Sequence, residues 1–370
     1  MSSPWSTTRF SVLDRSRTRQ GEDPPETLRH TVRFAQQAEG LGFHRFWVSE
    51  HHGVPGVAGS APTVLAAAIA AETSRIRVGT GGVMLPNHQP LVVAEQFGVL
   101  EALFPGRIDM GLGRSVGFTD GIRRALGRDK DAAEDFAEQL GELLGYFTPG
   151  PDGGPRVHAR PAEGLRIPAF VLATGAGAEH AAAFGLPLVI AAAGDEERML
   201  GAIERYREQF RPTEWGQEPY VVVAGTVAVA GSTEEARRIL LPEAWASAWS
   251  RTHGEFPPLR PVEEIARTEM TDRERALFEE AQQGHIHGTE PQVREALERL
   301  VERTAADEIL VTTSTYDREL QLESYHRLAR LTGVLSAGPQ GPGGQGAGGQ
   351  SSGAPGGRPQ GGAGTKGKGA

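Results

Sequence analysis

Two adjacent histidines follow a glutamate directly after a short apolar run, in the motif Glu50-His51-His52-Gly53. An imidazole exchanges a proton near neutral pH, so this motif suits general acid–base chemistry or a hydrogen bond to a polar intermediate. The alternative is a structural loop, in which Glu50 caps one histidine and water surrounds the other. We take His51, His52 and Glu50 as candidate catalytic residues beside that alternative.

A glycine-rich segment with one arginine, Gly111-Leu112-Gly113-Arg114-Ser115-Val116-Gly117, permits three interpretations. A dinucleotide-binding fingerprint fails, because the third glycine is misplaced. Residues 113–117 match the nucleophile elbow of serine hydrolases, and Asp195 with His285 or His287 would be the partners that Ser115 needs. In the third interpretation Arg114 binds a phosphate or carboxylate, since a planar guanidinium suits such anions.

Two further turns could hold a flat, anionic cofactor. The glycines of Thr80-Gly81-Gly82 would let a planar ligand approach the backbone, and a β-bulge is the alternative. The turn Thr174-Gly175-Ala176-Gly177 opens a predicted helix, whose N–H groups and dipole favour an anion. If the fold is a barrel, this turn and Arg114 lie on adjacent strand ends and bind one phosphate together.

His285 and His287 have the spacing of a metal-binding pair. In metal-dependent hydrolase barrels such a pair belongs on the first strand, whereas this one lies near the end of the chain. We therefore expect a short extended segment there and no metal. The chain has no cysteine, which excludes disulfides, a thiolate nucleophile and cysteine-ligated metals.

These motifs follow short apolar runs that alternate with longer segments of helical periodicity, the pattern of parallel βα units. The predicted strands are residues 10–13, 46–48, 76–79, 108–112, 169–172, 188–191, 220–228 and 308–311. Eight such units predict a (β/α)₈ barrel, with a doubly wound open sheet as the competitor. The surplus length falls at residues 148–168 and in a mostly helical insertion at residues 240–284.

Composition divides the chain into a barrel at residues 1–335 and a Gly/Pro-rich tail at residues 336–370. The tail has no apolar residue larger than alanine, so we expect it to be disordered.

With 38 basic and 47 acidic residues the net charge is −9, which argues against a nucleic-acid partner. We see no targeting signal and no apolar stretch long enough to cross a membrane, so we expect a cytoplasmic protein.

Several motifs together resemble the bacterial luciferase-like family of flavin-dependent monooxygenases. The resemblance covers roughly residues 10–331, and it is weakest in the insertion. It is carried by Trp47-Val48-Ser49-Glu50-His51-His52, Arg75-Ile76-Arg77-Val78-Gly79, Val83-Met84-Leu85-Pro86-Asn87-His88 and Pro105-Gly106-Arg107-Ile108-Asp109-Met110-Gly111-Leu112-Gly113-Arg114.

The resemblance implies a (β/α)₈ barrel, usually a homodimer, that binds FMN at the carboxyl ends of its strands. Such enzymes commonly take reduced FMN from a separate NAD(P)H-dependent flavin reductase. Oxygen adds at the flavin C4a position, and the C4a-peroxyflavin oxidises an aldehyde or another small organic substrate. The protein orients the flavin, excludes water and places proton donors.

Carried onto this chain, the resemblance makes His51 the acid–base residue near the flavin, supported by His52 and Glu50. Thr80, Gly81 and Gly82 would lie along the isoalloxazine ring, with a non-proline cis peptide bond of the kind found in this family. Arg114 and the turn formed by Thr174, Gly175, Ala176 and Gly177 would bind the FMN phosphate.

Two departures from the family and three rival functions remain. The phosphate turn keeps only the Thr174 hydroxyl, and Ala191-Ala192-Ala193-Gly194 after the sixth strand predicts a roomier substrate pocket. The rivals are a flavin- or F420-dependent reductase on the same fold, a Ser115 hydrolase and a flavin-binding protein without catalysis.

Overall fold

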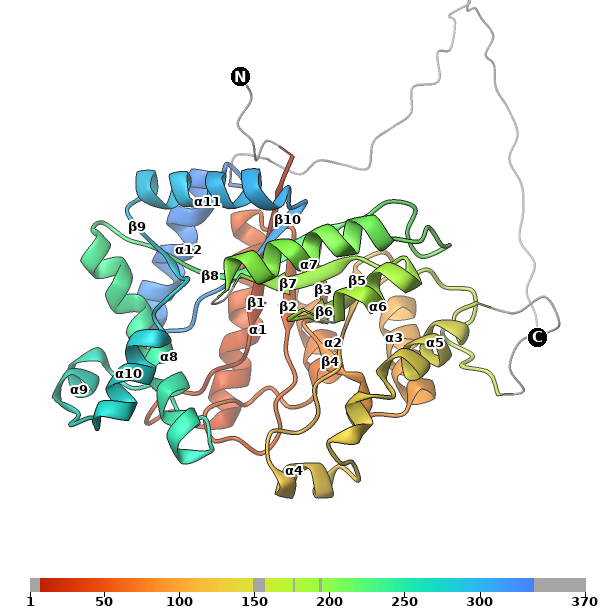
Figure 1. The fold of residues 1–370 in the computed structure, drawn as a ribbon, viewed down its shortest axis with the longest axis horizontal. Helices are drawn as coiled ribbons and strands as arrows, with labels where there is room; N and C mark the ends of the chain where they lie inside the picture. The colour runs from red at the N-terminus through yellow and green to blue at the C-terminus, as the bar shows by residue number, and fades with distance from the viewer. Residues whose placement is uncertain (1–6, 149–156, 176, 193–194, 336–370) are drawn as a thin grey trace, which may run out of the picture. The chain divides into compact units, whose positions relative to one another are not determined.

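The computed structural model describes residues 7–148, 157–175, 177–192 and 195–335. Over these residues eight parallel strands close into a barrel in the order β1, β2, β3, β5, β6, β7, β8, β10, and β10 pairs again with β1 (Figure 1). The eight are β1 Arg9–Asp14, β2 Arg45–Val48, β3 Arg77–Thr80, β5 Ile108–Gly113, β6 Ala169–Ala173, β7 Leu188–Ala191, β8 Val221–Val229 and β10 Glu308–Thr312. Each predicted strand is confirmed within a residue or two, and the closed pairing excludes the open sheet.

Helices follow the strands and cover the outside of the barrel. In the described residues they are α1 Pro24–Leu41, α2 Pro62–Glu72, α3 Pro90–Leu103, α4 Asp120–Ala125, α5 Phe136–Gly145, α6 Gly177–Phe184, α7 Glu196–Gln209, α8 Thr233–His253, α9 Val262–Arg267, α10 Asp272–Glu280, α11 Glu290–Thr304 and α12 Arg318–Thr332. Two one-turn 3₁₀ helices, η1 Leu85–Asn87 and η2 Asp131–Ala133, and two short strands, β4 Val83–Met84 and β9 Ile286–Gly288, complete the described elements.

The first helix shows how local sequence sets these boundaries. The Asp23 side chain accepts a hydrogen bond from Glu26 N–H, and Pro24-Pro25 follows, which is the preferred chemistry of a helix start. The helix ends at Gly42, whose φ of 87° lies in the left-handed region that favours glycine. Similar side-chain caps begin α7 and α12, so the sequence itself fixes where the chain turns back toward the barrel.

Charged side chains fill part of the barrel interior. Arg45 pairs with Asp109 at 2.8 Å and with Glu308 at 2.8 Å, and Arg77 pairs with Asp109 at 2.6 Å. Burial lowers the pKa of Arg45, but the two carboxylates outweigh it and raise that pKa above its usual value. An apolar cluster centred on Trp47 completes the interior.

The surplus residues between β8 and β10 form α8, α9, α10 and β9, on the left side of Figure 1. The predicted helical insertion is therefore confirmed, and β9 is the extended segment expected around His285 and His287. No described helix is both long and apolar enough to cross a membrane. The predicted tail lies outside the described residues.

Candidate active site

A cavity of about 430 Å³ opens at the carboxyl ends of the barrel strands. It brings together residues from six strands and the loops that follow them: Leu13, Met84, Gly113, Arg114, Ser115, Leu172, Ala173, Thr174, Gly177, Val189, Ala191, Arg198 and Ala224. Its size is in the range of small-molecule and cofactor sites. Three of the predicted phosphate-binding residues, Arg114, Thr174 and Gly177, line this one cavity, and Ala176 lies outside the described residues.

Arg198 is a cavity residue that the sequence reasoning missed. It belongs to the first turn of α7, whose start is capped by the Asp195 side chain accepting from Arg198 N–H at 3.0 Å. The Arg198 guanidinium lies against Gly175, where a Cβ would be 3.3 Å from Nη2. A cation in the first turn of a helix is unfavourable, because it opposes the helix dipole. This placement is the sequence feature that could have marked Arg198 as a ligand-binding residue.

The glycine pair after β3 adopts the backbone that the resemblance implied, since the peptide bond between Gly81 and Gly82 is cis. A Cβ on Gly82 would lie 2.8 Å from the backbone oxygen of Gly111, so close packing against β5 also favours glycine there. The Thr80 hydroxyl is buried and donates to Gly111 C=O at 2.7 Å. Thr80 could therefore contact a cofactor only through its backbone.

Glu50 is buried and accepts four hydrogen bonds. They come from His52 Nε2 at 2.8 Å, His88 Nε2 at 2.8 Å, Asn87 Nδ2 at 3.0 Å and Met84 N–H at 3.0 Å. Burial raises the pKa of Glu50, but the hydrogen bonds from the two histidines and Asn87 outweigh it and hold that pKa at about 2. The ionised carboxylate thus connects the segment after β2 to β4 by hydrogen bonds, and Met84 of β4 lines the cavity.

The Glu50 carboxylate accepts from the side chains of His52, Asn87 and His88, and among the described residues no hydrogen bond joins it to His51. The Glu50, His52 and His88 ligand atoms lie within 4.8 Å of one another, a grouping that a metal could use. Their hydrogen bonds explain the grouping without one. His88 and Asn87 belong to a motif that the resemblance included, yet only the tertiary contact with Glu50 reveals their role.

His51 has different partners. Its Nδ1 lies 3.2 Å from Ser49 Oγ, and its backbone N–H donates to Gly59 C=O at 3.0 Å. Burial first, and then the positive charges of Arg15 and Arg17, lower the pKa of His51 to about 4. His51 is therefore an uncharged imidazole at neutral pH, able to accept a proton or share one in a hydrogen bond.

The residues proposed for a serine hydrolase do not assemble. Asp195 caps α7, and His287 Nδ1 lies 3.4 Å from the His285 backbone oxygen. Among the described residues no hydrogen bond joins Ser115 to a histidine. A nucleophilic serine needs such a base, so the arrangement does not support a hydrolase.

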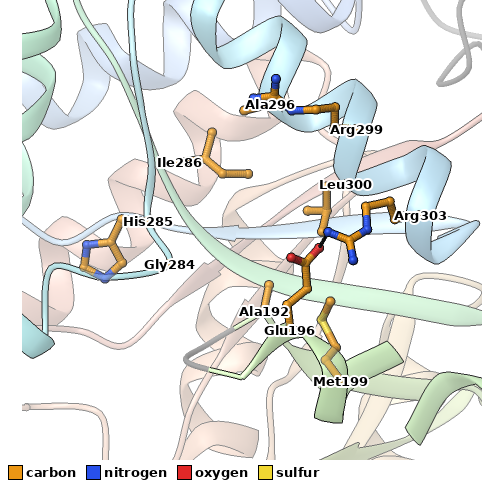
Figure 2. A pocket seen from close by; sticks show the side chains of 10 residues that line it. All are labelled: Ala192, Glu196, Met199, Gly284, His285, Ile286, Ala296, Arg299, Leu300 and Arg303. Carbon is orange, nitrogen blue, oxygen red and sulfur yellow. Dashed lines mark ion pairs between the residues drawn. The ribbon is translucent and has the colours of Figure 1, made fainter. Parts of the chain in front are cut away.

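A second cavity of about 340 Å³ lies between α7 and α11 (Figure 2). Glu196 and Arg303 form an ion pair at 2.6 Å across it, and His285 lies at the opposite end. Ala192 contributes to this cavity, whereas its neighbour Ala191 lines the first one. The small residues at the end of β7 therefore border one cavity each.

Comparisons with known proteins agree with this geometry. Residues 8–308 match the family model for luciferase-like monooxygenases. A luciferase-like monooxygenase of Escherichia coli strain K12 is 33% identical over 320 residues, which is 85% of this chain and 94% of that protein. An N-acetyl-S-alkylcysteine monooxygenase of Bacillus subtilis strain 168 is 39% identical over 243 residues, covering 62% of this chain and 70% of the relative.

Solved structures give the same fold. The crystal structure of apo-MsnO8 has a TM-score of 0.80 at 31% identity and covers 88% of this chain and 99% of its own. The FMN complex of the oxygenating component of 3,6-diketocamphane monooxygenase from Pseudomonas putida has a TM-score of 0.67 at 19% identity, over 88% of this chain and 97% of its own. From the family match, the identity and the closed barrel together, this chain belongs to the luciferase-like monooxygenases, which are oxidoreductases that incorporate molecular oxygen.

Proposed function

We propose that this chain uses reduced FMN and O₂ to oxidise a small organic substrate. The observation that carries the proposal is the cavity in which Arg114, Thr174 and Arg198 meet at the carboxyl end of the barrel. Two guanidinium groups and a helix N-terminus in one cavity fit a phosphate group. The FMN bound by the 3,6-diketocamphane enzyme, a neighbour in fold, supports the choice of cofactor.

Bound reduced FMN supplies the electrons and the atom at which O₂ is activated, and the chain's own residues provide the surroundings. Arg114 and Arg198 would hold the phosphate, and the glycine pair after β3 would lie along the flat ring. Uncharged His51 holds or moves a proton at an imidazole nitrogen, and Ser49 Oγ fixes its orientation through Nδ1. The proposal includes a separate NAD(P)H-dependent reductase as the source of reduced FMN, and a homodimer.

Residues in and beside α4 pack against the loop that carries His51 and against the insertion. A Cβ on Gly53 would lie 3.1 Å from Ile122 Cγ1 of α4, and the rings of Phe118 and Phe256 approach to 5.6 Å between centroids. These contacts join α4 and the insertion beside the mouth of the barrel. Such packing beside the mouth would limit the access of water to a bound flavin, whose chemistry with O₂ would need water to be excluded.

The test is to mix the full chain with chemically reduced FMN, admit air, and follow absorbance and hydrogen peroxide release. We expect a transient absorbance unlike that of reduced or oxidised FMN, and slower peroxide release than in buffer. His51→Gln should shorten that transient while FMN still binds, whereas the control His253→Gln, on the exposed end of α8, should behave as wild type. Flavin oxidation indistinguishable from buffer would contradict the proposal, and oxidation of a substrate by F420 alone would favour the reductase.

A further inference from the structure

Three segments that are distant in sequence pack together beside His51. Ala58 N–H donates to Ser16 C=O at 3.0 Å, and Thr18 N–H donates to Gly56 C=O at 3.0 Å. Leu259 of the insertion donates its N–H to Thr18 C=O at 2.9 Å. The chain that follows β1, including Arg15 and Arg17, is therefore fixed against the loop that begins with His51.

Two arginines share one carboxylate at this place. Arg15 Nη2 lies 3.1 Å from Glu243 Oε1, and Arg17 Nε lies 3.0 Å from Glu243 Oε2. The neighbouring Asp14 carboxylate instead accepts hydrogen bonds from Ser16 N–H and the Thr31 hydroxyl, both at 3.0 Å. The pair of guanidinium groups therefore has one positive charge more than its carboxylate partner neutralises.

The two guanidinium groups differ in what they leave free. The Arg17 side chain is 3% exposed, and it also donates through Nη2 to Pro257 C=O at 3.3 Å. The Arg15 side chain is 28% exposed, and its buried Nε has no hydrogen-bond partner among the described residues. Arg17 is held as part of the structure, whereas Arg15 keeps donors for a ligand.

The arginine segment also packs against the His51 loop, because a Cβ on Gly59, whose C=O accepts from His51 N–H, would lie 3.2 Å from Ser16 Cβ. Two partly buried cations that share one counter-ion are incompletely neutralised, and a guanidinium with free N–H groups binds a carboxylate through charge-assisted hydrogen bonds. Arg114, directly after β5, and Arg198, in the first turn of α7, line the cavity at the strand ends, so in the proposed function the flavin phosphate has its own cations.

We propose that the substrate carries a carboxylate and that Arg15 binds it, which places the atom to be oxidised near His51. This inference rests on the proposed function. The relative named N-acetyl-S-alkylcysteine monooxygenase is consistent with it, since such an N-acyl amino acid has one free carboxylate. Arg15 thereby selects anionic substrates over neutral ones of the same shape.

Binding to the full chain loaded with oxidised FMN tests this inference without oxygen chemistry. The probes are N-acetyl-S-methylcysteine and its primary amide, which keeps the shape and removes the charge. We expect the acid to bind at least tenfold more tightly than the amide. Arg15→Gln should weaken acid binding at least tenfold and leave amide binding and the FMN dissociation constant unchanged, and Arg15→Lys should restore part of the loss.

The control variant is Arg166→Gln, an exposed arginine in a surface ion pair with Glu214, which should bind both probes as wild type does. Equal binding of acid and amide, or no binding of either, overturns the inference. Weaker FMN binding in Arg15→Gln overturns it too, because Arg15 would then serve the flavin phosphate. If the acid is preferred through Arg15 but reduced FMN and air give no transient, the carboxylate site stands and the monooxygenase proposal fails.

Discussion

Replacing Arg114 or Arg198 with glutamine should weaken FMN binding and leave riboflavin binding unchanged. Both side chains line the cavity at the strand ends, and neither forms an ion pair among the described residues. A hydrogen bond to a charged group contributes about 1.5–3 kcal/mol, and about 1.4 kcal/mol corresponds to a factor of ten in affinity. Each substitution should therefore raise the FMN dissociation constant by about 10- to 150-fold.

Riboflavin provides the internal comparison, because it has the same ring and ribityl chain but no phosphate. Quenching of flavin fluorescence on titration with protein gives both dissociation constants. If the two arginines bind one phosphate, the double variant should lose less affinity than the sum of the single losses in free energy. Arg205→Gln is the matched control, since Arg205 is an exposed arginine on the same helix that does not line the cavity.

The reasoning would be refuted if both variants bound FMN as wild type does. It would also be refuted if FMN and riboflavin affinities fell equally, because the arginines would then act on the ring or on the fold. Salt provides a further check. The preference for FMN over riboflavin should shrink as ionic strength rises in the wild type, since screening weakens interactions between exposed charges.

Three further predictions concern stability, measured by urea unfolding. Arg45→Met should lower the free energy of unfolding by about 3–5 kcal/mol, because the buried carboxylate of Glu308 loses its ion-pair partner and Asp109 keeps only Arg77. Arg299→Met, which breaks an exposed pair with Glu295, should cost less than about 1 kcal/mol, and equal losses would contradict the argument. Glu50→Gln should lower the free energy of unfolding by about 1.5–3 kcal/mol, since the charge-assisted hydrogen bonds from His52 and His88 are lost. The control is Glu204→Gln on the exposed face of α7, which should be as stable as wild type. The His51 pKa of about 4 lies below the value of about 6.5 expected for the unfolded chain, so the unfolded chain binds more protons between these two pH values. The free energy of unfolding therefore falls as pH drops from about 6.5 toward about 4. His51→Gln should reduce that fall, and an unchanged pH dependence would count against the buried, uncharged imidazole.

Sequence alone determined the fold class and the positions of the strands. Alternating apolar runs and helical periodicity predicted all eight barrel strands, because side-chain burial repeats with the period of each element. The helical insertion and the extended segment near His285 followed from composition and spacing in the same way. The motifs also placed Arg114 and the Thr174 turn at neighbouring strand ends, where one cavity joins them.

Only the tertiary structure decided which side chains serve which partner. Glu50 is adjacent to His51 in sequence, yet its carboxylate accepts from His52 and from His88, which lies 38 residues further along the chain. Arg198 joins the phosphate-binding residues, and Glu243 neutralises one of two arginines beside His51, through contacts between segments far apart in the chain. Sequence periodicity reports burial and element type, whereas hydrogen-bond partners and unpaired charges depend on the distances that closure of the barrel creates.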